Sequence, residues 1–237
     1  MSVLVVAGTG SGVGKSVVTA AVAALAVARK AEVAVVKAAQ TGVGAGDDGD
    51  VDRVMRLSGV RTTFELGRFP DALPPAAAAR AAGLPPVSMT AAVTLVRELS
   101  ESNRLVLVEG TGGLLDRYDE DGATVADLAR TLRAQVLVVV SPAAGTVNDT
   151  ALTLEALAHR GLDLAGVVIG RWPAAPGLAE RSAVADLEML AARPLAGALP
   201  DGAGALPGPE TFLDVARRGL SATLGGAFDP ARFRQTA

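Results

Sequence analysis

The chain has 237 residues, a formal net charge of −3 and 50% hydrophobic residues, which suits one large α/β domain. The acidic balance gives no basic footprint for nucleic acid or for an anionic membrane, and the 3% aromatic content does not favour a stacking platform for single strands. With no cysteine and one histidine, the sequence excludes disulfides, thiolate metal sites, cysteine nucleophiles and histidine-rich metal sites. We expect a cytoplasmic protein, because no basic-flanked signal segment and no long apolar span is evident.

The N-terminal segment predicts a strand, a loop and a helix in succession. Residues 3–7 are an apolar run, a glycine-rich loop then ends in Gly14-Lys15-Ser16, and an Ala/Val/Leu run covers 17–28. Such a loop lets backbone N–H groups point at phosphate oxygens, while the lysine adds a full charge and the serine hydroxyl can ligate Mg²⁺. The pattern predicts a phosphate-binding loop.

The spacing of this loop departs from the ordinary pattern G-x-x-x-x-G-K-[ST]. Thr9 stands where a glycine is required, and the nearest glycine, Gly8, is one residue further back. The segment is therefore either a lengthened phosphate loop or a chance glycine cluster, and its strand–loop–helix context favours the first.

Strands and helices alternate along the rest of the chain. Strands are predicted at 33–36, 62–69, 105–108, 136–140, 164–169 and 195–199, and helices at 51–58, 76–82, 88–100, 124–133, 146–159, 177–192 and 209–224. This order predicts a doubly wound, mostly parallel sheet of about seven strands with helices on both faces, similar to P-loop NTPases. We expect one domain over 1–226 and a loosely ordered tail over 227–237.

The exits of these strands are the expected place for function, since ligands of such sheets lie beyond the carboxyl ends of the strands. Lys37 ends one apolar strand and Glu109 ends another, ahead of a run of glycines. A buried lysine needs an anionic partner, and a carboxylate beside a phosphate loop suits a Mg²⁺ ligand. The plainer alternatives are a lysine that reaches solvent and an ordinary polar strand end.

Other polar positions leave alternatives open. Asp47, Asp48, Asp50 and Asp52 form either a metal ligand cluster or a solvated loop, and the helix start at Gly145 either binds an anion or is only capped. Trp172 either packs on a nucleotide base or covers the edge of the sheet. His159 at a helix C-terminus is expected to be structural.

With these residues in view, the chain resembles the dethiobiotin synthetases, ATP-dependent ring-closing ligases of biotin synthesis. The family's lengthened loop G-T-x-x-x-V-G-K-[ST] is present at residues 8–16. Its segment K-P-x-x-[ST]-G is similar to residues 37–42, with Ala38 in place of proline. Its V-E-G-A-G-G is similar to residues 108–113, with Thr111 in place of alanine. The resemblance extends from residue 3 to about residue 202.

The resemblance implies an enzyme that carboxylates 7,8-diaminononanoate with CO₂ and closes a cyclic urea through a carbamic-phosphoric anhydride, with ATP as substrate and Mg²⁺ as cofactor. It implies catalytic roles for Lys37 and Lys15 and Mg²⁺ ligation by Ser16, Asp50 and Glu109. Asp50 is preferred to Asp47 and Asp52 because it stands six residues before Arg56-Leu57, as the family's metal aspartate does.

The resemblance also implies the binding residues. Nucleotide contacts are expected from Gly12, Val13, Gly14, Lys15, Ser16, Val17, Glu109, Gly110, Thr111, Gly112, Gly170, Arg171, Pro200 and Asp201. The diamine or its carbamate is expected at Ser11 and Thr41, and its carboxylate at Gly145, Thr146, Val147 and Asn148 of a partner subunit. That arrangement implies a homodimer with its sites at the interface, and no nucleic-acid or membrane partner.

Gly170 is a further departure from the family pattern. Many relatives carry an asparagine there that reads the adenine edge, and a glycine lacks the side chain for that hydrogen bond. We therefore predict weak discrimination between nucleoside triphosphates.

Two other enzyme classes share parts of this pattern. A cobyrinic acid amidating synthetase would need a glutaminase domain with a cysteine nucleophile, and this chain has no cysteine. A ParA-like positioning ATPase would carry an additional lysine early in the phosphate loop, and no lysine lies between Gly8 and Gly14. Both patterns fit the sequence less well than the synthetase.

Overall fold

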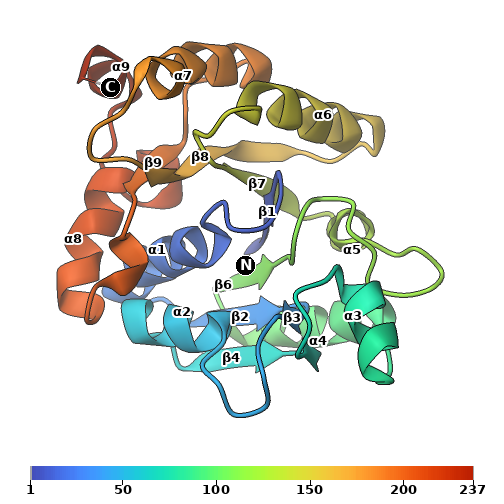
Figure 1. The fold of residues 1–237 in the computed structure, drawn as a ribbon. Coiled ribbons are helices and arrows are strands. Elements are labelled where there is room, and N and C mark those ends of the chain that lie inside the picture. The colour runs from blue at the N-terminus through green and yellow to red at the C-terminus, as the bar shows by residue number, and fades with distance from the viewer. Residues whose placement is uncertain (1, 237) are drawn as a thin grey trace.

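The computed structural model describes residues 2–236, and within them seven parallel strands form the central sheet (Figure 1). The strands are β1 (Ser2–Gly8), β2 (Val33–Lys37), β4 (Thr62–Glu65), β6 (Leu105–Glu109), β7 (Gln135–Val140), β8 (Leu164–Trp172) and β9 (Gly197–Pro200). Their order is β4-β2-β6-β1-β7-β8-β9, and all the pairings are parallel. The chain moves to one side of β1 and later to the other, so the doubly wound sheet is confirmed and its switch point lies at β1.

Helices cover both faces of the sheet. On one face lie α1 (Lys15–Ala28), α2 (Asp50–Ser58) and α8 (Pro209–Gly219); on the other lie α4 (Met89–Ser102), α5 (Val125–Leu132), α6 (Thr146–His159) and α7 (Leu178–Ala191). Successive strand residues point to opposite faces, so Val35 belongs to the first core layer and Val36 to the second. Across residues 2–236 no helix combines the length and the apolar character that crossing a bilayer requires.

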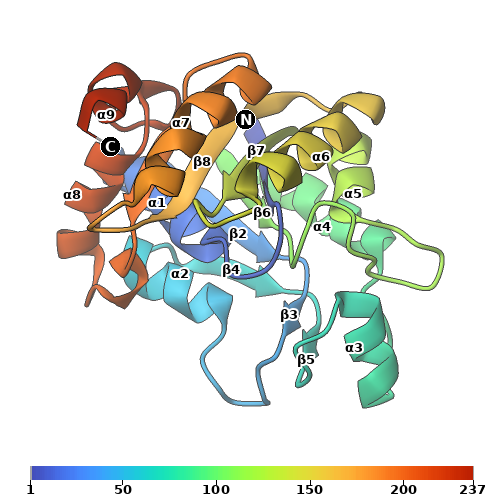
Figure 2. The same cartoon turned by 45° about the horizontal axis from the view of Figure 1, so that its top comes forward.

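A small second sheet extends the structure beside β2 and β4. Here β3 (Gln40–Thr41) pairs in parallel with β5 (Arg68–Phe69), next to α3 (Pro75–Ala82) (Figure 2). The single strand predicted over 62–69 is therefore wrong, because the chain leaves the main sheet after β4. The N–H of Leu66 donates to the carbonyl of Lys37, and Gln40 N–H donates to the carbonyl of Gly67. These two hydrogen bonds attach the segment after β2 to the residues between β4 and β5.

Two element ends near the C-terminus differ from the prediction. β8 continues to Trp172 instead of ending at 169, with a register irregularity against β9 after Ile169. The helix predicted to reach 224 ends at Gly219, where an added Cβ would lie 2.4 Å from Leu199 Cδ2. The following residue, Leu220, forms an antiparallel bridge to Gly197, and a short 3₁₀ helix covers Ala222–Leu224. Close packing against β9 therefore ends the helix early.

The residues predicted as a loosely ordered tail contain a helix, α9 (Pro230–Thr236). Phe233 lies with its ring centre 5.0 Å from that of Trp172, in an edge-on arrangement, and 5.2 Å from that of Phe228. Arg234 forms an ion pair with Glu188 of α7 at 2.5 Å. The rings of Trp172, Phe228 and Phe233 thus pack together against the hydrophobic core.

Candidate active site

The glycine-rich loop joins β1 to α1 at the switch point of the sheet. The N–H of Thr9 donates to the carbonyl of Val139 on β7 at 3.1 Å, which ties the start of the loop to the neighbouring strand. Gly12 and Gly14 have φ of +73° and +102°, a left-handed conformation that favours glycine. Gly14 directly precedes the first residue of α1, so the free N–H groups of the helix start lie at the end of the loop. The predicted strand–loop–helix is present at these residues.

The loop packs backbone to backbone against the exit of β8. A Cβ on Gly170 would lie 2.2 Å from the carbonyl oxygen of Val13, and a Cβ on Gly14 would lie 2.6 Å from the carbonyl oxygen of Gly170. Contacts below 3.0 Å are not tolerated without movement of the backbone. The glycine at 170 therefore permits this contact, and an asparagine would not fit on the same backbone.

A cavity of about 640 Å³ opens beside the loop at the carboxyl edge of the sheet. The residues expected at the site that line it are Ser11, Gly12, Gly14, Lys15, Ser16, Val17, Lys37, Thr41, Asp50, Glu109, Thr111, Gly112, Gly170, Arg171, Pro200 and Asp201. Its lining does not include Val13, which is buried behind the loop, Gly110, or the α6 start from Gly145 to Asn148. The structure thus brings together residues from the exits of five strands, β1, β2, β6, β8 and β9.

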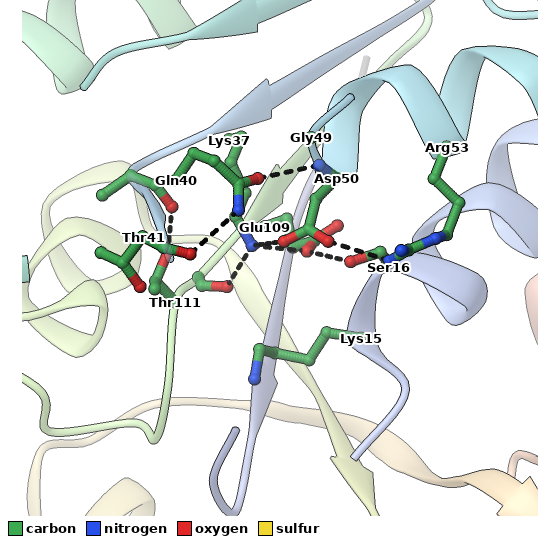
Figure 3. Close-up of polar contacts among 12 residues, drawn as sticks. Lys15, Ser16, Lys37, Gln40, Thr41, Gly49, Asp50, Arg53, Glu109 and Thr111 are labelled. Carbon is green, nitrogen blue, oxygen red and sulfur yellow. Dashed lines mark hydrogen bonds and ion pairs between the residues drawn. The ribbon is translucent and has the colours of Figure 1, made fainter. Parts of the chain in front are cut away.

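Lys37 lies at the centre of the charged side chains in this cavity (Figure 3). Its Nζ lies 2.7 Å from Glu109 Oε1 and 2.8 Å from Asp50 Oδ2. The hydroxyl of Ser16 donates to the same Glu109 oxygen at 2.8 Å. The alternative of a lysine reaching solvent is wrong, because Lys37 is 2% exposed and Glu109 is 1% exposed. Two carboxylates therefore hold the ammonium group of Lys37, and the Ser16 hydroxyl binds one of them.

The pKa values of the two lysines are shifted in opposite directions by their surroundings. Burial lowers the pKa of Lys37, but Glu109 and Asp50 outweigh it and raise the pKa above the ordinary lysine value. The same pairing lowers the pKa of Asp50 against the opposing effect of its partial burial. Burial and the like charge of Lys37 lower the pKa of Lys15 to about 8. Lys37 thus stays charged at neutral and alkaline pH, whereas Lys15 titrates just above neutrality.

Lys15 points along the loop, where its ammonium binds backbone oxygens. Its Nζ donates to the carbonyls of Gly10 at 2.7 Å and Gly112 at 2.8 Å. Figure 3 shows it beside the Lys37 group without a contact drawn to it. Because neutral carbonyls hold it, its charge is available to an anion in the cavity.

The acidic loop before α2 contributes one side chain to the site. The carboxylate of Asp50 contacts Lys37, and its N–H donates to Gln40 Oε1 at 2.8 Å. The carboxylate of Asp52 instead caps the helix by accepting from Gly49 N–H at 2.7 Å, and Asp47 is exposed on the loop. The structure therefore favours Asp50 among the three predicted candidates.

The donor set around Lys37 fits Mg²⁺ chemically. Within residues 2–236 no group of three or more His, Cys, Asp or Glu is placed to hold a metal by itself. Mg²⁺ is usually bound through one or two carboxylates together with substrate phosphates and water. Ser16, Asp50 and Glu109 supply two carboxylates and a hydroxyl next to a phosphate loop, which is that kind of partial site.

Several cavity residues were not predicted from the sequence. Gln40 and Arg53 both contact Asp50, and the Arg53–Asp50 ion pair spans 3.1 Å. Arg56 donates from one guanidinium nitrogen to the carbonyl of Gly204 at 2.8 Å and from the other to the carbonyl of Leu206. It thereby holds the 3₁₀ turn Ala203–Ala205, a wall of the cavity. Because Arg53 lies one helical turn after Asp50, its spacing could have predicted the ion pair between them. The Gly/Ala composition of residues 203–205 gives no comparable indication that they line a cavity.

The remaining predicted residues lie outside the cavity of their own chain. The start of α6 follows β7, with Gly145 as its N-cap at φ +89° and Asn148 exposed. The hydroxyl of Thr146 is buried and has no hydrogen-bond partner among the described residues. His159, as expected, lies at the end of α6, where Nδ1 is 3.2 Å from the carbonyl of Glu155. The role of the α6 start stays a prediction.

Comparisons with known proteins show which family this chain is similar to. The family model described as an AAA domain matches residues 2–204. An ATP-dependent dethiobiotin synthetase of Parafrankia sp. is 61% identical over 99% of this chain and 98% of its own, and that of Frankia casuarinae is 61% identical over the same shares. A solved ParA family ATPase of Chlorobium tepidum is 14% identical, covers 94% of this chain and 95% of its own, and has a TM-score of 0.56. At that identity the likeness shows the fold alone.

Proposed function

The chain belongs to the family of ATP-dependent dethiobiotin synthetases, and we propose that it carboxylates 7,8-diaminononanoate and closes the cyclic urea of dethiobiotin with ATP, in the cytoplasm. The observation that supports this best is the convergence of Lys15, Lys37, Asp50 and Glu109 in one cavity beside the phosphate loop. The reaction places negative charge on a carbamate and on a phosphoryl group at once. A site with two lysines suits that demand.

ATP binding falls to the loop and to the start of α1. The free N–H groups after Gly12 and the charge of Lys15 face the cavity, where the phosphates would lie. The exits of β8 and β9, with the Arg171–Asp201 ion pair at 2.9 Å, form the end of the cavity beside Gly12, whose carbonyl accepts from Arg171 Nη1 at 3.3 Å. We assign that end to the nucleoside.

Catalysis falls to Lys37. One amine of the diamine attacks CO₂ and loses a proton, giving a carbamate, whose oxygen then attacks the γ-phosphorus and releases ADP. The second amine attacks the carbamoyl carbon, closes the ring and releases phosphate. The raised pKa of Lys37 keeps it protonated, so it acts as an electrostatic stabiliser and not as a base. Each well-placed donor of this kind lowers a barrier by roughly 3 kcal/mol.

Mg²⁺ would be held by Ser16, Asp50 and Glu109. When bound, it would neutralise negative charge on the phosphate oxygens. The Lys37–Glu109 and Lys37–Asp50 contacts hold both carboxylates beside the phosphate loop, and Lys37 keeps the pKa of Asp50 below its ordinary value.

The test is ATP turnover in bicarbonate, with and without the diamine. We expect release of phosphate to depend on the diamine and to match formation of dethiobiotin. ATP turnover at the same rate with and without the diamine would disprove the proposed synthetase activity and would indicate a switch ATPase. In the same assay Lys37→Ala should lower kcat by about a hundredfold or more with little change in the Kd of ATP. Equal losses would move Lys37 to nucleotide binding.

We further propose a homodimer in which the start of α6 from one subunit binds the substrate carboxylate at the cavity of the other. The N–H of Thr146 donates to the Ala143 carbonyl at 3.1 Å, but the other N–H groups in the first turn of α6 suit an anion, and this turn lies outside the cavity of its own chain. Lys37→Ala and Asn148→Asp subunits, each inactive alone, should regain about a quarter of the wild-type activity when mixed, because heterodimers rebuild one intact site. No recovery on mixing, or a fully active monomer in light scattering, would refute the shared site.

A further inference from the structure

Thr111 connects two of the strand exits that build the cavity. Its hydroxyl donates a hydrogen bond to the carbonyl of Ala39, and its backbone N–H donates to the hydroxyl of Tyr118 at 2.7 Å. Tyr118 is fully buried and Thr111 is 9% exposed. Figure 3 shows Thr111 beside Gln40 and Thr41, the residues that follow Ala39. The link therefore joins the loop after β6 to the segment after β2.

The segment after β2 carries the groups on which the proposed chemistry depends. It begins with Lys37 and ends with Thr41, and the Ala38 N–H donates to the Glu109 carbonyl at 3.1 Å. Gln40 Oε1 accepts from the N–H of Asp50, so the same segment also holds the start of α2. Thr111 touches neither Lys37 nor Asp50 through a side-chain bond, yet it fixes the backbone between them.

Burial makes this link strong relative to a surface contact. A buried carbonyl that loses its donor costs about 1–3 kcal/mol, because no water replaces the bond. Burial also raises the pKa of Tyr118, so its phenol stays neutral and its hydroxyl remains a fixed acceptor for Thr111 N–H. Tyr118 thus anchors the inner end of the link.

We propose that Thr111 is a positioning residue for the ring-closing reaction. Its hydroxyl holds the Lys37–Thr41 segment at the distance from Glu109 at which Lys37 faces both the carboxylates and the substrate. The proposal rests on the proposed function, since it concerns the placement of the carbamate-stabilising lysine. It predicts an effect on the chemical step and little effect on nucleotide binding, because the hydroxyl and the N–H of Thr111, an expected nucleotide contact, are both bonded within the chain.

The experiment compares Thr111→Val, which keeps the shape and removes the hydroxyl, with Thr111→Ser, which keeps the hydroxyl. We expect Thr111→Val to lower kcat by about tenfold or more while the Kd of ATP changes by less than about threefold, because a small displacement of a catalytic group affects mainly the chemistry. Thr111→Ser should retain activity within about twofold of wild type. Thr131→Val is the matched control, since it removes a hydroxyl-to-carbonyl bond to Asp127 on α5, away from the cavity.

The outcomes separate the proposals. A wild-type kcat in Thr111→Val would overturn the positioning role, as would an equal loss in Thr111→Ser. If Thr111→Val does not fold, Tyr118→Phe decides, because it removes the acceptor of Thr111 N–H and leaves Thr111 intact. We expect the same kcat-selective loss there, and an unchanged kcat would overturn the role. Wild-type turnover without dependence on the diamine would instead disprove the function on which the role rests.

Discussion

Gly170 and Val13 are in direct backbone contact, so closely that a Cβ at 170 would lie 2.2 Å from the Val13 carbonyl oxygen. This contact seats the lengthened phosphate loop on the exit of β8. A second clash, 2.8 Å to Val139 Cγ1, leaves no room on the other side. The position of the loop against β8 therefore depends on a glycine at 170.

The first prediction is that Gly170→Ala weakens nucleotide binding. The added methyl group must push the loop away from β8, so we expect the Kd of ATP to rise by about tenfold or more, equivalent to roughly 1.4 kcal/mol. Titration calorimetry measures this change. Gly10→Ala is the matched control on the same loop, because nothing lies within 4 Å of a Cβ there and its φ is not positive. Equal affinities of Gly170→Ala and wild type would show that the contact is not required.

The second prediction concerns the choice of base. Gly170 has no side chain to read a base edge, and the adjoining end of the cavity offers Arg171 and Asp201 already paired with each other. We expect the Kd values of the four nucleoside triphosphates to lie within about a hundredfold of one another. Preference for ATP by a hundredfold or more over all the others would contradict it.

How much of this site is visible in the sequence follows from the geometry of a parallel sheet. Lys37 and Glu109 are the last residues of their strands, and the phosphate loop directly follows β1. The carboxyl ends of parallel strands lie at the same edge of a sheet, so the order of strands along the chain predicts that these residues lie close together. Asp50 could be predicted only as one of several acidic residues. The link from Thr111 to Ala39 joins residues 72 apart and leaves no periodic signal.

The parts that could not be predicted depend on packing between distant segments. The wall at Ala203–Ala205 is a short turn of small residues whose place depends on Arg56, 148 residues earlier than Gly204. The early end of α8 depends on contact of Gly219 with Leu199. Local propensity carries no information on either contact, because both follow from the tertiary arrangement.

The third prediction is a pH dependence of nucleotide affinity through Lys15. Its pKa of about 8 lies below the ordinary value of 10.5, and phosphates require the charged form. Between pH 7 and pH 9 the affinity for ATP should fall by roughly tenfold as Lys15 loses its proton. Calorimetry at constant ionic strength measures it. Lys37→Met removes a like charge, so the fall should move to higher pH in that variant.

Deprotonation of Lys15 affects stability in the opposite direction to nucleotide affinity. In the window from pH 8 to 10.5 the unfolded chain keeps a proton on Lys15 that the folded protein has lost. The unfolded state then binds more protons, so the contribution of Lys15 to the free energy of unfolding rises with pH across this window. A nucleotide affinity that does not change between pH 7 and pH 9 would contradict the assignment of Lys15.

The fourth prediction distinguishes the acidic residues. Asp50→Asn should raise the Mg²⁺ concentration for half-maximal turnover by about tenfold or more, because it removes one of two carboxylates at the site. Asp47→Asn, on the exposed part of the same loop, should leave it unchanged. A metal titration of turnover at saturating ATP measures both. A shift in Asp47→Asn without one in Asp50→Asn would reassign the ligand.

The fifth prediction concerns α9 and uses Trp172, the single tryptophan of the chain. Its ring packs edge-on against Phe233, and Phe233 in turn contacts Phe228. Phe233→Ala should lower the free energy of unfolding by about 1–2 kcal/mol, since the residue is partly buried and loses an aromatic pair. For a chain of this size that change corresponds to a Tm lower by roughly 2–8 °C.

The same variant should change the fluorescence of Trp172. Loss of the Phe233 ring exposes the indole to water, so the emission should shift to longer wavelength in the native state. Phe233→Leu is the control, because it keeps an apolar side chain over the indole and should shift the emission less. Arg234→Ala tests the neighbouring ion pair with Glu188, whose removal should leave the emission unchanged, since an arginine that is 45% exposed contributes little. Unchanged emission and Tm in Phe233→Ala would show that the contact of Phe233 with Trp172 does not contribute to stability.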